Sequence, residues 1–250
     1  MLDDQALSRA LERAGIRAPV RFDEVTRSTQ EAALGMASDG APEWTLVSAR
    51  HQTAGRGRLG RTWHDEPGRA LMFSLVLRPD LSPELGGLLT LLAGTTLVRA
   101  CAELGSTDAA CRWPNDLLVA GRKAGGILAE SRVAGGRFEH VVLGVGVNLG
   151  APPPGLPEAG AVEAEDEALL TGFLRAFAEG YRPADPAFAH SVTAAYREVC
   201  ATLGTRVRAR TSTGAIVEGS ALDVDGTGAL VVGTATGTAL VRFGELEHLE

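Results

Sequence analysis

Three arginines and three glycines fall within nine residues, GRGRLGRTW from Gly55 to Trp63, of a 250-residue chain whose net charge is −7. Guanidinium groups present planar forks of donors that match carboxylate and phosphate oxygens, and glycine lets the backbone come close to a ligand. The stretch therefore predicts a loop that closes over a small anion, with Arg56, Arg58 and Arg61 as its cations. When the run is considered alone, the alternative is a solvated basic loop that either contacts nucleic acid or has no ligand.

Three further segments carry polar groups that would suit the same site. They are Ser28 to Gln30, the run RWPNDLLVAGRKAGGILAE from Arg112 to Glu130, and GVGVNL from Gly144 to Leu149. Hydroxyl and amide side chains can satisfy a polar ligand in an apolar slot, where unpaired polar groups are costly. The glycines of the last segment would let a strand approach a ligand closely.

The apolar pattern places these segments around one sheet. Alternating or continuous apolar runs predict strands at 22–25, 44–50, 70–78, 110–113, 116–120, 124–132 and 138–149. Helical spacing predicts helices at 2–15, 28–37, 85–104, 165–180 and 186–203, with Gly204 at the end of the last. The basic loop would then join two strands, and the strands from residue 110 onward would form a meander.

Composition changes after residue 203. Residues 205–250 are rich in Val, Thr and Gly, with turn signals at 212–214, 225–228 and 236–237, which predicts four or five short strands of a small barrel. The predicted fold class is α+β, with a mixed β-sheet flanked by helices over residues 1–203 and a small all-β barrel over 204–250.

Composition also excludes several classes of protein. The net charge of −7 argues against broad binding to DNA or to an anionic membrane. The first fifteen residues do not resemble a signal peptide, and no apolar run approaches the ~20 residues that a bilayer span needs, so we expect a cytoplasmic protein. Three widely spaced cysteines, Cys101, Cys111 and Cys200, fit neither a disulfide framework nor a zinc site and are predicted to be reduced packing residues.

Taken together and in this order, the four segments resemble those of the biotin protein ligases. GRGRLGRTW, and WPND followed by KAGGIL, are the most specific part of a resemblance that runs from about Ser28 to Gly150 and more weakly to the end. It implies a catalytic domain of the biotin/lipoate ligase type and a C-terminal barrel of src-homology type. It also implies a monofunctional ligase, because this chain lacks the N-terminal winged-helix module of the family's bifunctional repressors.

The resemblance implies a two-step activity. Biotin's carboxylate joins the α-phosphate of ATP with release of pyrophosphate, and biotin then passes from biotinyl-5′-adenylate to one lysine of a biotin carboxyl carrier domain. The carboxylate is already ionised at neutral pH, so the enzyme must hold two anions together and stabilise charge on the phosphate. The implied substrates are biotin and ATP with Mg²⁺, the implied partner is the carrier domain of a carboxylase, and a homodimer stays open.

The resemblance also assigns roles to residues. The implied catalytic residues are Lys123, Arg56 and Arg58. The implied biotin-binding residues are Ser28, Thr29, Gln30, Gln52, Gly55, Arg56, Gly57, Arg58, Lys123 and Gly126. The implied ATP-binding residues are Arg58, Arg61, Trp63, Asn115, Asp116, Lys123, Gly146 and Asn148, with Asp116 also as a ligand of magnesium. Two positions depart from the family: Gln30 stands where Asn is commonest, and Arg112 stands where Lys is usual.

Each assignment has a structural alternative. Ser28 and Thr29 are suited to cap the helix that follows, Asn115 and Asp116 to form an Asx-turn, Lys123 to be a solvated hairpin lysine, and Trp63 to be core packing. For the whole chain, the alternatives are a lipoate or octanoate ligase of the same fold and a nucleic-acid-binding protein. Polar Ser28 and Gln52 argue against a long alkyl slot, and the acidic charge argues against nucleic acid.

The basic loop is also expected to move. An acyl-adenylate hydrolyses readily, so we expect residues 55–63 to be mobile without ligand and to fold over the intermediate, where they exclude water.

Overall fold

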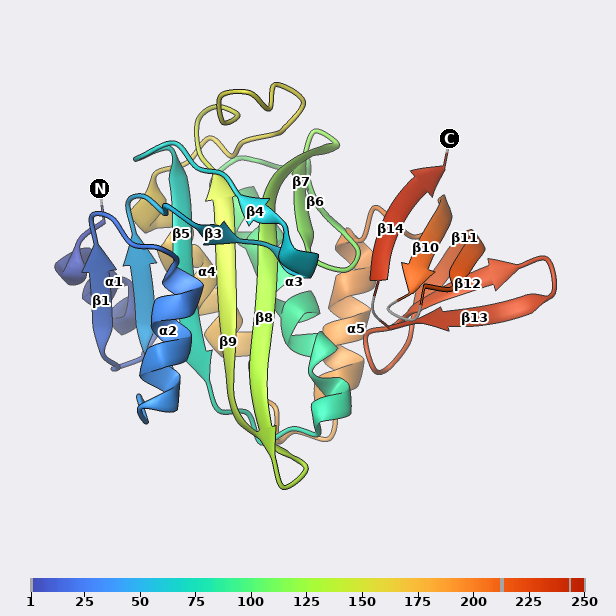
Figure 1. Ribbon diagram of the computed structural model, residues 1–250, viewed down its shortest axis with the longest axis horizontal. Helices are drawn as coiled ribbons and strands as arrows, with labels where there is room; N and C mark the ends of the chain where they lie inside the picture. Colours follow the sequence, from blue (N-terminus) through green and yellow to red (C-terminus); the bar gives the residue numbers. More distant parts are fainter. Residues whose placement is uncertain (1, 212–213, 243, 250) are drawn as a thin grey trace.

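The computed structural model describes residues 2–211, 214–242 and 244–249, and a seven-stranded mixed sheet lies at its centre (Figure 1). The strand order is β1 (Val20–Asp23), β2 (Leu46–Ala49), β5 (Ala70–Leu77), β9 (Arg137–Asn148), β8 (Arg122–Ala134), β7 (Asp116–Val119) and β6 (Ala109–Arg112). β1 and β2 are parallel, and the other neighbours are antiparallel. The predicted mixed sheet and its final meander are confirmed.

Helices cover both faces of this sheet (Figure 1). On the front face, α2 (Thr29–Ser38) packs on Val47, Val76 and Val142. The main core lies on the back face, beneath α1 (Asp4–Arg13), α3 (Gly87–Glu103), α4 (Asp166–Gly180) and α5 (Phe188–Val199). Because α2 covers only one half of the front face, the front of β8 is left for the basic loop.

The apolar helix predicted at 85–104 is the central helix of the core. Together with the short 3-10 helix η2 (Pro83–Leu85), α3 is long and apolar enough to cross a bilayer, yet 67% of its most apolar window is buried inside the protein. It packs against α4 and α5. A buried core helix passes the same test of length and composition, so its burial accounts for its hydropathy.

A second sheet of five antiparallel strands follows α5. Its order is β13 (Gly237–Val241), β12 (Leu230–Thr234), β11 (Ile216–Val224), β10 (Arg206–Thr211) and β14 (Gly244–Leu249). The predicted all-β region is confirmed. Within the described residues no ladder joins β13 to β14, so the sheet is open where the sequence predicted a barrel. Part of the turn predicted at 212–214 lies outside the described residues.

The two sheets meet at Trp113. This indole is 2% exposed, its Nε1 donates to the carbonyl of Gly228 at 3.0 Å, and its backbone N–H donates to Thr202 Oγ1 at 3.0 Å. Core residues of the second sheet, Val207 among them, belong to the same buried cluster as those of the first. The domain boundary near Leu203 stays a prediction.

The helix predicted at 186–203 ends earlier, at Val199. Cys200 is extended, with a ψ of 102°, and forms a parallel bridge with Cys111, while the N–H of Ala201 donates to the Cys111 carbonyl. Pairing with β6 therefore overrides helical propensity in the last turn. Gly204, with a φ of +82°, lies beyond the helix and in the turn that leads to β10, which corrects its assignment as the helix-ending glycine.

The three cysteines are buried free thiols, as predicted. Burial raises the pKa of Cys101 to about 12 and also raises the pKa of Cys111. Both groups are therefore neutral at physiological pH and act as small apolar side chains.

An ion pair between α5 and β11 gives a pH-dependent prediction. Arg197 Nε lies 2.5 Å from Asp223 Oδ1, and the hydrogen bond from Arg197 lowers the pKa of Asp223. The pair therefore stabilises the fold above the unfolded pKa of aspartate, and this contribution is lost as the pH falls through the lower folded pKa. Since Asp223 is half-exposed, we expect Asp223→Asn to lower the free energy of unfolding at pH 7 by no more than about 1 kcal/mol. Urea unfolding of both proteins would check this, and a difference that persists in strong acid would contradict it.

Candidate active site

The basic loop forms a hairpin across the front of β8 and β9 (Figure 1). β3 (Gly55–Arg56) pairs with β4 (Thr62–Trp63), and the 3-10 turn η1 (Arg58–Gly60) closes the end. The N–H of Gly57 donates to the carbonyl of Arg61 at 2.8 Å. At the tip, Leu59 adopts the left-handed conformation with a φ of 56°, and it is 63% exposed. The hairpin lies over the sheet in this structure, and its predicted opening without ligand stays a prediction.

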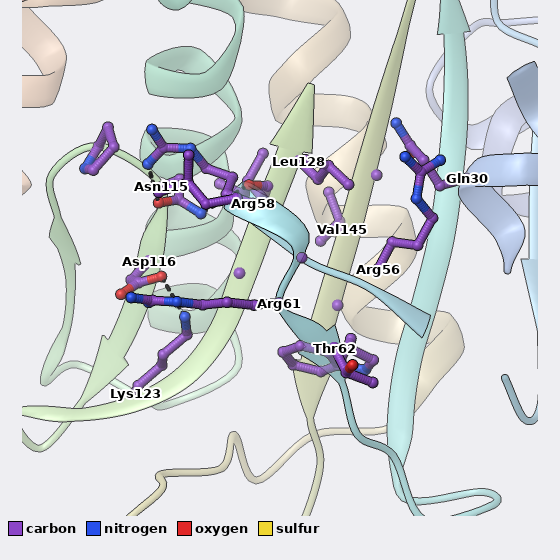
Figure 2. A pocket seen from close by; sticks show the side chains of 18 of the residues that line it. Gln30, Arg56, Arg58, Arg61, Thr62, Asn115, Asp116, Lys123, Leu128 and Val145 are labelled. Atoms are coloured by element: carbon purple, nitrogen blue, oxygen red, sulfur yellow. Dashed lines mark hydrogen bonds and ion pairs between the residues drawn. The ribbon is translucent and has the colours of Figure 1, made fainter. Parts of the chain in front are cut away.

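A cavity of about 190 Å³ lies between this hairpin, the N-terminus of α2 and strands β7 to β9 (Figure 2). Most of the residues singled out in the sequence line it together. They are Ser28, Thr29, Gln30, Gln52, Arg56, Gly57, Arg58, Arg61, Trp63, Asn115, Asp116, Lys123, Gly126 and Gly146. Segments up to about half the chain apart in sequence therefore meet in one place.

Gly55 and Asn148, by contrast, do not line this cavity. A Cβ at Gly55 would lie 2.6 Å from the Trp63 carbonyl, so glycine lets β3 and β4 approach each other there. Asn148 is buried, and its Nδ2 donates to the carbonyl of Gly160 at 3.0 Å. The N–H of Gly160 donates in turn to the carbonyl of Lys123 at 2.9 Å. In this structure Asn148 fixes the backbone beside Lys123, and a contact between Asn148 and ATP stays a prediction.

Neutral polar side chains form one end of the cavity. Gln52 Oε1 accepts a hydrogen bond from the N–H of Thr29 at 2.7 Å and lies 3.2 Å from Thr29 Oγ1. Ser74 Oγ lies 3.0 Å from Thr29 Oγ1 and 3.1 Å from Gln30 Oε1. The four side chains are buried, so their remaining donors and acceptors suit a polar ligand removed from water.

Ser28 occupies the N-cap position of α2 but its side chain makes no capping hydrogen bond. Its hydroxyl is buried without a hydrogen-bond partner among the described residues, and Ser28 lines the cavity. A buried hydroxyl without a partner is costly, and a bound polar ligand would satisfy it. The ligand-binding role predicted for Ser28 therefore has more support than the capping role.

Sequence reasoning did not single out Ser74 as a site residue, although one signal was present. It is the single hydroxyl side chain in the otherwise apolar strand β5, at a buried position where a polar group needs a partner. Gly144, opposite Ser74 on β9, is also required here because a Cβ would collide with Gln30 Oε1.

Charged side chains gather at the other end of the cavity, where Figure 2 shows Arg61, Lys123 and Asp116 close together. Asp116 Oδ1 lies 2.6 Å from Lys123 Nζ, and its Oδ2 lies 2.6 Å from Arg112 Nη2. The carboxylate thus orients both cations, and it gives Arg112 a defined partner. Arg112, which stands where Lys is usual in the family, lines the cavity as well.

Arg58 reaches the same end from the hairpin. Its Nη1 donates to Asn115 Oδ1 at 3.0 Å, and Asn115 Nδ2 donates to the carbonyl of Ile127 at 2.9 Å. Burial lowers the pKa of Arg58, against the opposing charge of Asp116, but a guanidinium keeps its proton at neutral pH. The end near Asp116 is therefore cationic, and it suits carboxylate and phosphate oxygens.

Asp116, the predicted ligand of magnesium, already has two partners in this structure. Its two carboxylate oxygens pair with Lys123 and Arg112, and the described part of the chain contains no group of three or more His, Cys, Asp or Glu residues that could hold a metal. Because Mg²⁺ that binds with nucleotide phosphates needs only one or two protein carboxylates, the role of Asp116 as a metal ligand stays a prediction.

The indole of Trp63 lies flat against Gly146, which gives a prediction about the hairpin. A Cβ on residue 146 would lie 2.8 Å from Trp63 Cε2, so Gly146→Ala is expected to displace the indole and lift the hairpin from β9. Limited trypsin digestion should then cleave after Arg58 or Arg61 several-fold faster than in the unchanged protein. Gly35→Ala in α2, where nothing lies within 4 Å of the added Cβ, is the control. Equal cleavage rates in all three proteins would contradict the prediction.

The arrangement supports one kind of chemistry. A slot with neutral polar groups at one end and cations at the other can align an uncharged polar head, an apolar chain and an anionic tail. Leu128 and Val145 line the part between the two ends (Figure 2). Such a site promotes reaction by positioning two anions and by stabilising charge between them.

Two family models and several known proteins match this chain. Residues 22–148 match the Biotin/lipoate A/B protein ligase family, and residues 202–249 match the Biotin protein ligase C terminal domain. The Biotin--[acetyl-CoA-carboxylase] ligase of Mycobacterium tuberculosis is 33% identical over 239 residues, covering 90% of this chain and 86% of that protein. The ligase of the same name from Paracoccus denitrificans is 34% identical over 244 residues, covering 88% and 97%.

A bifunctional relative and a solved structure extend the comparison. The Bifunctional ligase/repressor BirA of Bacillus subtilis is 32% identical over 237 residues, which covers 90% of this chain but 73% of that protein. The structure of the biotin protein ligase from Aquifex aeolicus in complex with biotin and ATP superposes with a TM-score of 0.77 at 21% identity, over 92% of this chain and 99% of that chain. At that identity the structural match shows the shared fold.

Proposed function

The chain belongs to the biotin protein ligase family, and on that premise we propose that it uses ATP to attach biotin to a lysine of a biotin carboxyl carrier protein. One observation carries the proposal: a single cavity joins a neutral polar end at Thr29 and Gln52 to a cationic end at Arg58 and Lys123. Biotin has the same polarity, with a neutral ureido ring at one end and a carboxylate at the other.

In the first step, this chain would act by alignment. Ser28, Thr29 and Gln52 would bind the ureido ring, while Lys123 and Arg58 would hold the carboxylate beside the α-phosphate of ATP. A carboxylate oxygen then bonds to the phosphorus as pyrophosphate leaves. The side chains need to remove no proton, because the carboxylate is already ionised, so the main contribution is stabilisation of negative charge.

In the second step, an acceptor lysine replaces the adenylate. Its neutral amine attacks the acyl carbon, the bond to the phosphate oxygen breaks, AMP leaves, and the amine nitrogen loses a proton to solvent. Lys123, oriented by Asp116 at 2.6 Å, is placed to stabilise the charge that returns to the phosphate. The hairpin would keep water from the acyl carbon until the carrier arrives.

The proposal extends to the ions and partners of the reaction. Magnesium would bind mainly through the phosphates of the nucleotide, with at most one or two protein carboxylates. The partner is the carrier domain of a biotin-dependent carboxylase, in the cytoplasm, and a homodimer is compatible with the edge strand β1.

Biotin-dependent labelling of a purified carrier domain, with ATP and Mg²⁺, tests the proposal. We expect labelling that disappears when the acceptor lysine of the carrier is replaced by arginine. ATP/pyrophosphate exchange measured with biotin and with lipoate separates the two ligase activities, and exchange that only lipoate supports would overturn the choice of substrate. Binding of nucleic acid in a filter assay, without binding of biotin, would overturn the enzyme assignment itself.

A further inference from the structure

One arginine of the hairpin is directed to a partner outside the proposed catalytic group. Arg56 Nη2 lies 2.8 Å from Glu130 Oε1 on β8, and Figure 2 shows Arg56 on the Gln30 side of the cavity rather than on the Asp116 side. We propose that Glu130 is a positioning residue that latches the hairpin over the bound biotinyl-adenylate and so sets how long the intermediate is retained. This inference rests on the proposed ligase activity.

The position of Glu130 in the sheet suits a latch. Residues 126, 128 and 130 alternate along β8 and face the hairpin. Gly126 lies under Trp63, since its added Cβ would be 4.0 Å from the ring, and Leu128 lines both the cavity and a second pocket beside the hairpin. Glu130 is the next residue on that face. Its bond to Arg56 therefore ties the end of β3 to the sheet, just before the turn that carries Arg58.

The ion pair between Arg56 and Glu130 has room for a second hydrogen bond. Glu130 Oε1 accepts from Arg56, whereas Oε2 is buried without a hydrogen-bond partner among the described residues. A guanidinium and a carboxylate can form two parallel hydrogen bonds, so Oε2 is available to a second Arg56 N–H. Arg56 has five N–H donors, so it can hold Glu130 and still direct donors to the ligand.

A second attachment lies on the opposite side of the hairpin, between Arg58 and Asn115 at 3.0 Å. That contact belongs to the proposed catalytic group. Glu130 does not line the main cavity but lines the second pocket beside the hairpin. Replacing Glu130 should therefore release one side of the hairpin without removing a group that touches the ligand.

The test separates retention of the intermediate from its formation. Enzyme loaded with labelled biotinyl-adenylate is freed of substrates by rapid gel filtration, and the loss of bound label is followed without acceptor. For Glu130→Gln we expect the loss to be about tenfold faster, equivalent to ~1.4 kcal/mol, because the charge-assisted bond is weakened. The first turnover of pyrophosphate release should stay within about twofold of the unchanged enzyme, since the cationic end is intact.

Two further variants make the comparison specific. Glu139→Gln is the matched control, because Glu139 on β9 forms a similar exposed pair with Arg132 at 2.6 Å, away from the hairpin; it should retain the intermediate normally. Glu130→Asp keeps the charge but shortens the reach, so it should restore part of the retention that Glu130→Gln loses. Glu130→Asp also serves as the test variant if the Glu130→Gln protein does not fold.

A double-mutant comparison shows whether Glu130 acts through Arg56. On an Arg56→Ala background, Glu130→Gln should have no further effect on retention. The latch is overturned if Glu130→Gln retains the adenylate normally, if it slows formation as much as it speeds loss, or if its effect persists in full without Arg56. An unchanged enzyme that forms no adenylate at all would instead overturn the proposed function, and the latch with it.

Discussion

Lys123→Ala is expected to lower the rate of biotinyl-adenylate formation by about 10³-fold, because it removes the cation that we propose stabilises the two reacting anions. Its Nζ lies 2.6 Å from Asp116, which fixes the ammonium at the cationic end of the cavity. The side chain is 43% exposed, so its loss leaves no cavity in the core and the thermal unfolding midpoint should not change. Biotin-dependent ATP/pyrophosphate exchange measures the rate.

Two variants control this experiment. Arg122→Ala removes the exposed cation next to Lys123 in the sequence and should leave exchange nearly unchanged. Lys123→Arg keeps the charge but replaces a compact ammonium by a planar fork, so it should recover only part of the activity. Exchange at the original rate in Lys123→Ala would contradict the catalytic assignment, whereas a lowered unfolding midpoint would show that Lys123 also supports the fold.

Much of the fold could be predicted because its signals are local. The strands of the main sheet and the buried helix α3 each carry their own apolar pattern, which needs no knowledge of their neighbours. The end of α5 shows the limit of such patterns. Its helical spacing continues past Val199, but the chain leaves the helix there to pair Cys200 with Cys111, a contact 89 residues away in sequence. Nothing in the local pattern predicts this pairing.

The candidate site also contains residues that local motifs identify and residues that only the folded structure brings together. Most residues assigned from the Gly/Arg, WPND and KAGGIL motifs do meet in one cavity, with Gly55 as an exception. The partners of Ser74 and Glu130 could not be assigned, because the buried hydroxyl on β5 and the glutamate on β8 meet them only when α2 and the hairpin lie beside the sheet. Asn148 belongs to a motif, but its amide donates to the Gly160 carbonyl, which lies in the connection between β9 and α4.

Trp113→Ala is expected to lower the free energy of unfolding by about 3–5 kcal/mol, since it would leave a large cavity where the two sheets meet. Trp113→Phe is the matched control. It keeps an aromatic ring but removes the Nε1–H that donates to the Gly228 carbonyl. It should therefore lower the free energy of unfolding by about 1–3 kcal/mol, because that carbonyl is left without its hydrogen bond. Urea unfolding followed by circular dichroism measures both, and an alanine variant no less stable than the phenylalanine variant would contradict the role of the ring.

The shape of the same unfolding curve tests the domain boundary near Leu203. The two sheets share one buried cluster, and Trp113 joins them through Gly228 and Thr202. If residues 204–250 form a separate folding unit, removing this joint should split one cooperative transition into two, with the small sheet unfolding first. If the two sheets fold as one unit, the variant should keep a single transition at lower urea. Trp113 directly precedes the turn that holds Asn115 and Asp116. If the transition splits, activity should therefore be lost in the first unfolding transition, at urea concentrations where the main sheet is still folded.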